Sequence, residues 1–466
     1  MSQAMMTLFE AAAALGIVPP AQDAPFLRVT SDSRAIAAGD LFVAISGERF
    51  DGHDFARAAL AQGAAGVLVA RDLGLERQLL TAGSKAALGQ LAKHWRAQFT
   101  LPLIAVTGSN GKTTVKQMIA SILAAHVKLQ LRENETAAFA TIGNLNNGIG
   151  LPLTLLRLRA EHKIAVVELG MNHPGEIAQL ADITRPTVAL VNNAQREHQE
   201  FMKSVADVAV ENGAVFNYLA DNGTAVINAD DEFAGYWRKL ARQHHPQRNI
   251  IDFGVRIAAE VSANYHLALY GSDIELMTPA GDAEVTLRIP GVHNVQNACA
   301  AAACAVAAGV RINAIEAGLN AFVPYSGRLQ KKVAANGAVV IDDTYNANPD
   351  SVRAAIDVLA NVAGRRMLVL GRMGEVGDDG PKFHHEVGVY AKLRGIDALL
   401  AFGPETAPAV EGFGAHGVRF DDIDTIKIKA SEFAVPGATL LVKGSRSAQM
   451  ERVVAALTGE TSEGPH

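Results

Sequence analysis

The residues best suited to chemistry form one glycine-containing run, Thr107-Gly108-Ser109-Asn110-Gly111-Lys112-Thr113-Thr114. The run follows the apolar segment 103–106 and opens a helical pattern. Glycines let backbone N–H groups turn toward a phosphate, and a helix N-terminus adds partial positive charge. In such a loop the lysine reaches the β- and γ-phosphates of a nucleotide, and the next hydroxyl binds Mg²⁺. Val106 stands where the full motif has another glycine, so this is the shorter form, GxxGK[ST]. A chance glycine-rich turn is the alternative, and the flanking strand and helix disfavour it.

A magnesium ion needs further ligands, and two candidates follow neighbouring strands. Glu168 ends the apolar strand that begins at Ile164, and His198 follows the strand 188–191. Alone, each would be interpreted as a surface or capping residue. In a parallel sheet, however, both strand ends lie at the edge that binds ligands. Together with Thr113 they predict a Mg²⁺ site that is completed by ATP phosphates and water.

Three blocks of strands and helices would position these residues. Residues 1–99 alternate short strands and helices and predict a smaller α/β domain. Residues 100–322 contain continuous apolar strands separated by helices, which is typical of a doubly wound parallel sheet of P-loop type. Within this block, residues 250–290 predict a β-rich excursion, followed by an Ala-rich helix over 294–308. Residues 323–466 predict a C-terminal Rossmann-like α/β domain. The fold class is therefore α/β with three domains.

Composition excludes several classes of protein. The chain has 466 residues, of which 49% are hydrophobic and 19% charged, with a formal net charge of −6. This balance argues against a general nucleic-acid or anionic-membrane binder. No uncharged apolar run reaches the ~20 residues of a membrane span, and residues 1–20 lack a basic segment ahead of an apolar one. We therefore expect a cytoplasmic protein. Cys299 and Cys304, the two cysteines, are expected to be buried small residues.

Further motifs lie outside the phosphate loop. They occupy residues 31–34, 39–44, 47–53, 143–147, 168–172, 291–294 with Asn297, 326–328, 342–349 and 443–447. With them, almost the whole chain resembles the Mur ligase family, ATP-dependent enzymes that form amide bonds in cell-wall precursor synthesis. The segment Tyr345-Asn346-Ala347-Asn348-Pro349 resembles the members that add D-alanyl-D-alanine to UDP-N-acetylmuramoyl-tripeptide. Sibling ligases typically carry a His-containing segment there.

The resemblance implies a role for each matching residue. It makes ATP and Mg²⁺ the cofactors, held by the phosphate loop with Thr113, Glu168 and His198. It places three further residues beside the nucleotide: Asn297, Arg328 and Asp343. It places six around the UDP-muramoyl peptide: Ser33, Arg34, Arg49, Asn144, Asn146 and Asn147. The resemblance also places three residues beside the dipeptide: Asn346, Asn348 and Arg372. Without the resemblance, most of these would be surface or turn residues, and Asn348 is also a good helix N-cap.

One departure from the family pattern concerns a helix after His198. Many Mur ligases carry a carbamylated lysine there, which helps to hold a second Mg²⁺. The corresponding residue here is Asn212, which has no charge and cannot be carbamylated. Glu211 offers a carboxylate, but one residue along a helix points ~100° away. The resemblance therefore does not carry over the second metal.

The resemblance also implies the reaction. A γ-phosphoryl transfer would turn the peptide carboxylate into an acyl phosphate, which the dipeptide amine would attack, with Lys112 and Mg²⁺ neutralising charge. Two alternatives remain: another amino-acid-adding Mur or folylpolyglutamate-type ligase, and a non-catalytic nucleotide-binding scaffold. The partners would be the two small-molecule substrates, with no nucleic acid and no membrane insertion, and the protein is expected to be a monomer.

Overall fold

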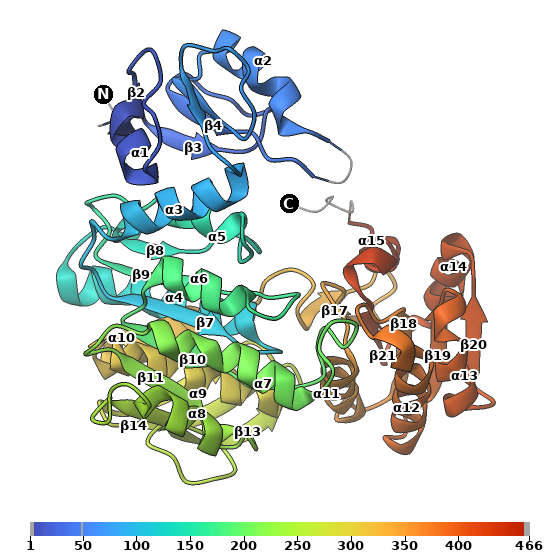
Figure 1. Ribbon diagram of the computed structural model, residues 1–466. Coiled ribbons are helices and arrows are strands. Elements are labelled where there is room, and N and C mark those ends of the chain that lie inside the picture. Colours follow the sequence, from blue (N-terminus) through green and yellow to red (C-terminus); the bar gives the residue numbers. More distant parts are fainter. Residues whose placement is uncertain (1–3, 48–49, 461–466) are drawn as a thin grey trace.

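The computed structural model describes residues 4–47 and 50–460, which build three main sheets covered by helices (Figure 1). The N-terminal sheet is parallel, with strands β3 (Arg28–Thr30), β4 (Asp40–Val43), β5 (Gly66–Val69) and β6 (Gln78–Leu80). A small antiparallel pair, β1 (Met6–Thr7) and β2 (Pro25–Phe26), lies beside it. Its helices are α1 (Leu8–Leu15), α2 (Ala56–Ala61) and α3 (Ser84–Arg96). In Figure 1, α3 lies between this sheet and the central part of the molecule.

The central sheet is parallel throughout, in the order β12-β11-β10-β7-β9-β8. Its strands are β7 (Leu103–Thr107), β8 (Ala138–Ala140), β9 (Ile164–Glu168), β10 (Val188–Val191), β11 (Thr224–Asn228) and β12 (Ile250–Phe253). One face packs against α4 (Lys112–His126), α9 (Val292–Ala307) and α10 (Ile312–Ala321). The other packs against α5 (Gly150–Leu155), α6 (Glu176–Thr184), α7 (Val205–Gly213) and α8 (Ala234–Arg242). The helices therefore cover both faces, as in a doubly wound sheet.

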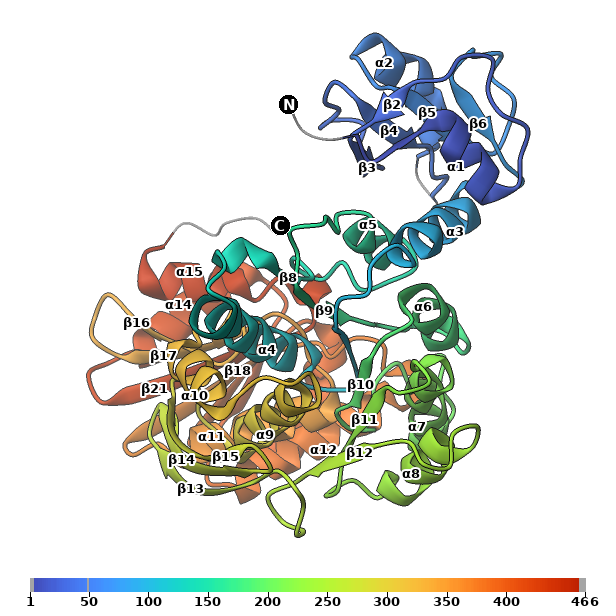
Figure 2. The same ribbon diagram turned by 90° about the vertical axis from the view of Figure 1, so that its left-hand side faces the viewer.

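An antiparallel layer covers α9 and α10 on their outer side. It consists of β13 (Ser262–Ala268), β14 (Gly271–Thr278) and β15 (Gly281–Leu287). Figure 2 shows this layer at the lower left, beneath α9. The β-rich excursion predicted over 250–290 is thus confirmed.

The C-terminal sheet has the order β16-β17-β21-β18-β19-β20, with β16 the antiparallel edge strand. Its strands are β16 (Gln330–Val333), β17 (Val339–Asp343), β18 (Arg365–Gly371), β19 (Ala398–Phe402), β20 (Gly417–Phe420) and β21 (Ala438–Lys443). Its helices are α11 (Pro349–Ala360), α12 (Gly380–Leu393), α13 (Ala407–Phe413), α14 (Ile423–Phe433) and α15 (Glu451–Thr458). The first three pack together, and α14 packs with α15 against the other face of the sheet. The sheet is thus also doubly wound.

Alternating side chains of each central strand enter two different cores. In β7, Ile104 and Val106 belong to the core beneath α4, whereas Leu103 and Ala105 belong to the core beneath α5 and α6. The first core continues into the C-terminal sheet, and the second continues into the N-terminal sheet. Apolar packing therefore joins the three sheets across the predicted boundaries after residues 99 and 322, both of which fall between elements.

Most predicted elements are confirmed, with small differences at their ends. Helix α7 is regular to Gly213 and then tightens into a 3₁₀ turn over Ala214–Tyr218, as the last turns of helices often do. Cys299 and Cys304 are free and fully buried on α9. Burial raises the pKa of the Cys299 thiol to about 12, which leaves it inert at neutral pH. Within the described residues no helix is long and apolar enough to cross a membrane.

Candidate active site

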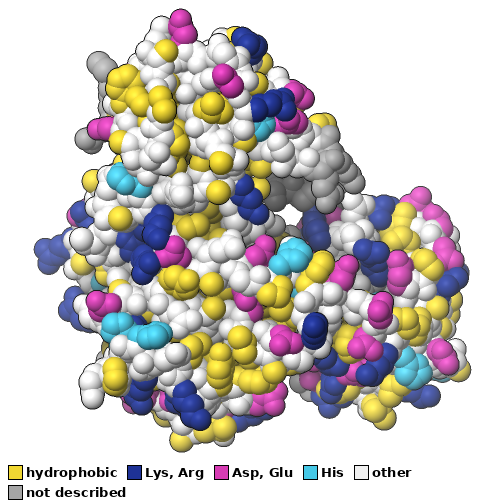
Figure 3. All heavy atoms as spheres, in the orientation of Figure 1, with side chains coloured by type: hydrophobic (Ala, Val, Ile, Leu, Met, Phe, Trp, Pro, Cys, Tyr) yellow, Lys and Arg dark blue, Asp and Glu magenta, His cyan; other side chains and the backbone are white. Residues whose placement is uncertain are grey.

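A cavity of about 780 Å³ opens at the carboxyl edge of the central sheet. The central part contributes the phosphate loop and the segments that follow β8, β9 and β10. The C-terminal part contributes the segments that follow β17, β18 and β21, and Lys85 of α3 reaches in from the third side. Figure 3 shows the surface hollowed between the upper, N-terminal part and the C-terminal part on the right. The site is therefore composite.

The phosphate loop owes its shape to two glycines with left-handed backbone. Gly108 has φ +128°, and a Cβ there would lie 2.9 Å from the backbone nitrogen of Asn192. Gly111 has φ +82°, and a Cβ there would lie 2.5 Å from Oδ1 of Asn297. Only glycine combines this conformation with so close an approach. Asn297 also accepts a hydrogen bond from Nδ2 of Asn192 at 3.0 Å, so it supports the loop from α9.

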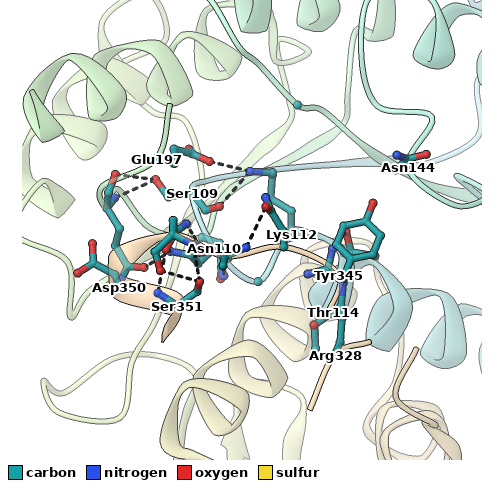
Figure 4. A pocket seen from close by; sticks show the side chains of 18 of the residues that line it. Ser109, Asn110, Lys112, Thr114, Asn144, Glu197, Arg328, Tyr345, Asp350 and Ser351 are labelled. Carbon is teal, nitrogen blue, oxygen red and sulfur yellow. Dashed lines mark hydrogen bonds and ion pairs between the residues drawn. The ribbon is translucent and has the colours of Figure 1, made fainter. Parts of the chain in front are cut away.

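The loop lysine is held inside the loop by three acceptors. Lys112 Nζ donates to the carbonyls of Gly108 at 2.5 Å and Ser109 at 3.1 Å, and it lies 3.1 Å from Oε2 of Glu197 (Figure 4). The Glu197 side chain is only 6% exposed, so this ion pair is largely shielded from solvent. An incoming phosphate would take the place of the carboxylate, and Lys112 is already aimed at it.

Two of the three predicted magnesium ligands are in direct contact. Thr113 Oγ1 donates to Oε1 of Glu168 at 3.2 Å, and Asn146 Nδ2 donates to the same oxygen at 2.8 Å. Oε2 of Glu168 is buried and has no hydrogen-bond partner in the described part of the chain. A hydroxyl beside an unpartnered carboxylate oxygen suits a hard cation such as Mg²⁺. Between residues 4 and 460, apart from the two undescribed ones, no three His, Cys, Asp or Glu side chains gather as a metal site. Phosphates and water would therefore have to supply the remaining ligands.

His198, the third predicted ligand, lines the same cavity but faces the C-terminal part. Its Nδ1 lies 2.5 Å from Oε2 of Glu375, and its Nε2 lies 3.8 Å from Oε2 of Glu197. Its backbone is left-handed, with φ +49°, which directs the ring across the interface between the sheets. The contact with His198 holds the pKa of Glu375 below its usual range. Glu375 therefore stays ionised beside the imidazole.

The residues predicted to lie near the nucleotide all line the cavity. Arg328 NH2 donates to Oγ1 of Thr113 at 3.0 Å, and its guanidinium stacks 4.1 Å from the centre of the Tyr345 ring (Figure 4). Asp343 accepts from Nζ of Lys443 at 2.6 Å and from the backbone of Leu329 at 3.2 Å. Arg328 thus reaches Thr113 in the phosphate loop, while Asp343 is engaged within the C-terminal part.

The residues predicted for the UDP-muramoyl peptide divide into two groups. Asn144, Asn146 and Asn147 line the cavity, and Oδ1 of Asn147 caps α5 by accepting from the backbone of Gly150 at 2.9 Å. Ser33 and Arg34 lie in the turn between β3 and β4 and do not line the cavity; the Arg34 side chain is 88% exposed and pairs with Asp32 at 2.9 Å. Arg49 lies outside the described residues.

The residues predicted for the dipeptide also divide. Asn346 and Asn348 line the cavity, but Asn348 is the N-cap of α11 and donates to Oδ1 of Asn110 in the phosphate loop at 2.9 Å. Arg372 does not line the cavity. Its guanidinium donates to Oγ of Ser447 at 3.0 Å and pairs with Glu405 at 3.2 Å. Among the residues that the structure describes, the Asn346 side chain bonds only within its own loop, accepting from the backbone of Ala347.

The helix with the departure from the family pattern supports the phosphate loop directly. Asn212 of α7 is 1% exposed, and its Oδ1 accepts from Oγ1 of Thr107 at 2.6 Å and from the backbone of Gly108 at 2.9 Å. Glu211 points elsewhere, where its carboxylate accepts from the backbones of Gly175 and Ile177 at 2.8 Å and caps α6. Both side chains therefore have structural partners.

Sequence reasoning did not single out several residues of this site. Glu197 directly precedes the predicted ligand His198, and this adjacency is the sequence feature that could have pointed to Glu197 as a site residue. Arg196 binds Asp350 and Glu386 across the interface between the central and C-terminal sheets, at 2.6 Å and 2.8 Å. Lys116 lies one helical turn after Thr113 and is fully buried, a position where a lysine is rare. No local pattern marks such partnerships, because the partners are distant in sequence.

Three family models match the chain. They are the Mur ligase middle domain over residues 106–305, the Mur ligase glutamate ligase domain over 327–446, and the Mur ligase family catalytic domain over 27–132. Together they span the phosphate loop, Glu168, His198 and the C-terminal loops described above.

Relatives and solved structures agree with these models. The chain is 42% identical to UDP-N-acetylmuramoyl-tripeptide–D-alanyl-D-alanine ligase of Escherichia coli strain K12 over 92% of this chain and 93% of that one. It superposes on a crystal structure of MurF from Acinetobacter baumannii with a TM-score of 0.88 and 35% identity, covering 97% and 98% of the two chains. A MurF ligase of Thermotoga maritima, crystallised with ADP, matches with a TM-score of 0.79 and 26% identity, covering 93% and 97%.

Proposed function

The chain belongs to the Mur ligase family, and from that premise we propose that it joins D-alanyl-D-alanine to the terminal carboxylate of UDP-N-acetylmuramoyl-tripeptide. The reaction consumes ATP, forms an amide bond and serves peptidoglycan precursor synthesis. The observation that carries the proposal is the 42% identity to a ligase of this name over 92% of the chain. The composite cavity with its phosphate loop supports it.

The chemistry requires activation of a carboxylate. A carboxylate does not acylate an amine at neutral pH, because oxide is a very poor leaving group. Transfer of the γ-phosphoryl group of ATP to a carboxylate oxygen gives an acyl phosphate and ADP. The amine of the dipeptide then attacks the acyl carbon, the C–O bond to phosphate breaks, and the ammonium proton is released to solvent or to a carboxylate.

The chain's own residues supply positioning and charge. The backbone of residues 107–114 cradles the phosphates at the N-terminus of α4. Lys112 exchanges Glu197 for a phosphate oxygen and neutralises charge as the phosphoryl group moves. Arg328 brings a second cation, a guanidinium, to the same loop. These roles are carried by groups that already point into the cavity.

Thr113, Glu168 and His198 would hold Mg²⁺ together with the nucleotide. The unpartnered Oε2 of Glu168 supports this assignment. When bound, the cation would supply positive charge to the β- and γ-phosphate oxygens. Asn212 brings no carboxylate to the loop, so we propose no second metal that depends on α7.

In this proposal, each part of the chain binds one substrate. Residues 1–99 bind the UDP-muramoyl peptide, residues 100–322 bind ATP, and residues 323–466 bind the dipeptide. Closure of these parts on the substrates would exclude water from the acyl phosphate. We further propose that the enzyme works in the cytoplasm, where its nucleotide substrates are made, and that it is a monomer.

A substrate panel tests the function. Purified enzyme is given ATP, Mg²⁺ and UDP-muramoyl tripeptides ending in lysine or in diaminopimelate, with D-alanyl-D-alanine or with single amino acids as acceptors. We expect ADP release that depends on the dipeptide and on one of the tripeptides. Ligation of a single amino acid instead would favour another amino-acid-adding ligase. ATP binding without any ligation would favour a scaffold.

The variant Lys112→Ala tests the phosphate loop within that assay. We expect kcat to fall by at least about 100-fold, because a charge that acts on the transferring group is lost. Lys128→Met is the matched control, since Lys128 lies beyond the C-terminus of α4 with a side chain that is 68% exposed. Near-normal ligation by Lys112→Ala would contradict the assignment.

A further inference from the structure

The carboxyl end of β21 lies at the switch point of the C-terminal sheet. Strand β21 is hydrogen-bonded to β17 on one side and to β18 on the other. The helices after β17 and β18 cover one face, whereas the helix after β21 covers the opposite face (Figure 1). In open α/β sheets, ligands bind in the crevice outside the carboxyl ends of strands at such a point. Lys443, the last residue of β21, and Arg446, in the turn that follows, line the cavity there.

Most of the positive side chains around the cavity are already engaged. Within the described residues, the lysines and arginines that line it are Lys85, Lys112, Arg196, Arg328, Lys443 and Arg446. Four of them make hydrogen bonds to protein acceptors; Lys443, for example, lies 2.6 Å from Asp343 and 2.8 Å from the carbonyl of Asn346. Lys85 makes none, but it lies beside Gly148 of the central part. Arg446 is thus the remaining cation on the C-terminal side.

Among the described residues, the Arg446 guanidinium has no close hydrogen-bond acceptor. Its side chain is 45% exposed and, among the described residues, donates no hydrogen bond. Its nearest carboxylate is Glu451, with 3.6 Å between NH1 and Oε1. That separation is longer than the 2.7–2.9 Å of a charge-assisted hydrogen bond. Glu451 also lines the cavity, and its other oxygen is buried and unpartnered. The pair therefore leaves a guanidinium available to an anion in the cavity.

The turn that carries Arg446 is held in place from the adjacent strand. The backbone of Ser445 donates to the carbonyl of Arg372 at 2.9 Å, and Oγ of Ser447 accepts from Nε of Arg372 at 3.0 Å. Arg372 thus fixes the two residues on either side of Arg446 while staying outside the cavity. A rigid turn lowers the entropy lost when a ligand binds its side chain.

We propose that Arg446 binds the carboxylate of the incoming D-alanyl-D-alanine, and that Arg372 acts as a positioning residue behind it. This inference rests on the proposed function. A guanidinium recognises a carboxylate through two parallel N–H donors, which also fixes the direction of the dipeptide. The amine end of the dipeptide is then directed away from β21 and toward the phosphate loop. Arg446 would thereby select an acceptor that carries a free C-terminal carboxylate.

The test compares two acceptors that differ only in that carboxylate, D-alanyl-D-alanine and D-alanyl-D-alaninamide. Wild-type enzyme is expected to prefer the acid, by about 10- to 100-fold in KM, as charged hydrogen bonds typically contribute. In Arg446→Met, KM for the acid should rise by that factor while KM for the amide stays unchanged. KM values for ATP and for the UDP-muramoyl tripeptide should not move, and Arg446→Lys should restore part of the preference.

Arg452→Met is the matched control, because Arg452 lies on the next helix, α15, does not line the cavity and bonds to the backbone of Gln449. If Arg446→Met keeps the full preference for the acid, the inference is wrong. If it loses activity equally on both acceptors, Arg446 does not read the carboxylate, and the inference is again wrong. Arg446→Gln gives the same comparison should the methionine variant fail to fold. Failure of the wild-type enzyme to use D-alanyl-D-alanine at all would instead refute the proposed function.

Discussion

Oδ1 of Asn212 lies 2.6 Å from Oγ1 of Thr107, so an amide of α7 holds the base of the phosphate loop from 105 residues away. The same oxygen accepts from the backbone of Gly108 at 2.9 Å, and Nδ2 donates to the carbonyl of Val208 at 3.2 Å. All three contacts are buried. A neutral side chain that offers both an acceptor and donors can satisfy this arrangement completely. Asn212, where the family resemblance implied a charged group, is here part of the scaffold.

Replacing Asn212 by leucine should therefore loosen the loop. The variant leaves the Gly108 N–H and the Thr107 hydroxyl buried without an acceptor, which costs about 1–3 kcal/mol of unfolding free energy. We expect KM for ATP to rise together with that loss. Urea unfolding and an ATP titration measure the two effects, and Asn222→Leu, at an exposed turn, is the control. A stability equal to that of the wild type would contradict the role given to Asn212.

Because residue 212 is an asparagine, we expect the ligation rate not to depend on carbon dioxide. An amide side chain cannot be carbamylated, so ligation rates should be equal in degassed buffer and in buffer with added bicarbonate. The measurement is a simple rate comparison at constant pH. A rate that depends on bicarbonate would show that another group near the loop carries a carbamate.

Glu168 predicts a change in the magnesium requirement. Glu168→Gln keeps an oxygen for Thr113 and Asn146 but removes the charge beside the orphaned oxygen. We expect the Mg²⁺ concentration for half-maximal activity to rise by at least about 10-fold. Calorimetric titration of Mg²⁺ with a non-hydrolysable ATP analogue gives a readout besides activity. Glu161→Gln, at an exposed turn before β9, should leave the magnesium response unchanged.

Arg196 joins the central part to two helices of the C-terminal part. Its guanidinium binds Asp350 of α11 and Glu386 of α12, and its own backbone donates to Asp350 at 3.0 Å. Hydrogen bonding to Arg196 holds the pKa of Glu386 below its usual range. Arg196→Met removes the cation that binds these two carboxylates of the C-terminal part, and partial exposure limits the loss of stability to about 1–2 kcal/mol.

We expect Arg196→Met to favour an open arrangement. Small-angle scattering of the free enzyme should show a larger radius of gyration, and kcat/KM should fall by about 10-fold as closure becomes less favourable. Arg419→Met, whose exposed arginine pairs with Asp421 on the far edge strand β20, is the control. An unchanged radius with an unchanged kcat/KM would show that Arg196 does not govern closure.

Lys116 connects the phosphate-loop helix α4 to the segment after β8, which is proposed to bind the UDP-muramoyl peptide. Its buried ammonium donates to the carbonyls of Thr141 at 3.1 Å and Gly143 at 3.3 Å, so α4 holds the segment that carries Asn144 and Asn146. In Lys116→Met we expect KM for the UDP-muramoyl tripeptide to rise by about 10-fold, the scale of one charged hydrogen bond. KM for ATP should change less. An equal rise in both KM values would point to general loosening of the loop.

The same variant has a pH signature. Burial lowers the pKa of Lys116 from its usual value. Between the folded and the unfolded pKa the unfolded chain binds more protons, so stability rises with pH through this window. Relative to Lys116→Met, the wild-type protein should therefore gain unfolding free energy as the pH rises toward the ordinary lysine pKa of 10.5. Urea unfolding at several pH values tests the sign, and a difference that is flat or falls with pH would contradict it.

The sequence alone determined the fold class, the phosphate loop and the family. These features are local: an apolar strand, a turn of glycines and a helix that starts at Lys112 specify one another through neighbouring backbone geometry. The strand ends that carry Glu168 and His198 followed from the same reasoning, because parallel strands present their carboxyl ends at one edge.

Only the tertiary structure decided which side chains meet. Arg328 donates a hydrogen bond to Thr113, which lies 215 residues away in the sequence. Asn212 accepts a hydrogen bond from Thr107. Glu197 forms an ion pair with Lys112. The tertiary structure also placed Arg372 behind the cavity and Arg446 inside it, although the two lie on adjacent strand ends. Backbone conformation is fixed by residues close in sequence, whereas a side chain's partner depends on how distant segments pack. That packing joins the three sheets through shared cores. The two partners of each contact are far apart in the sequence, so no local pattern reveals them.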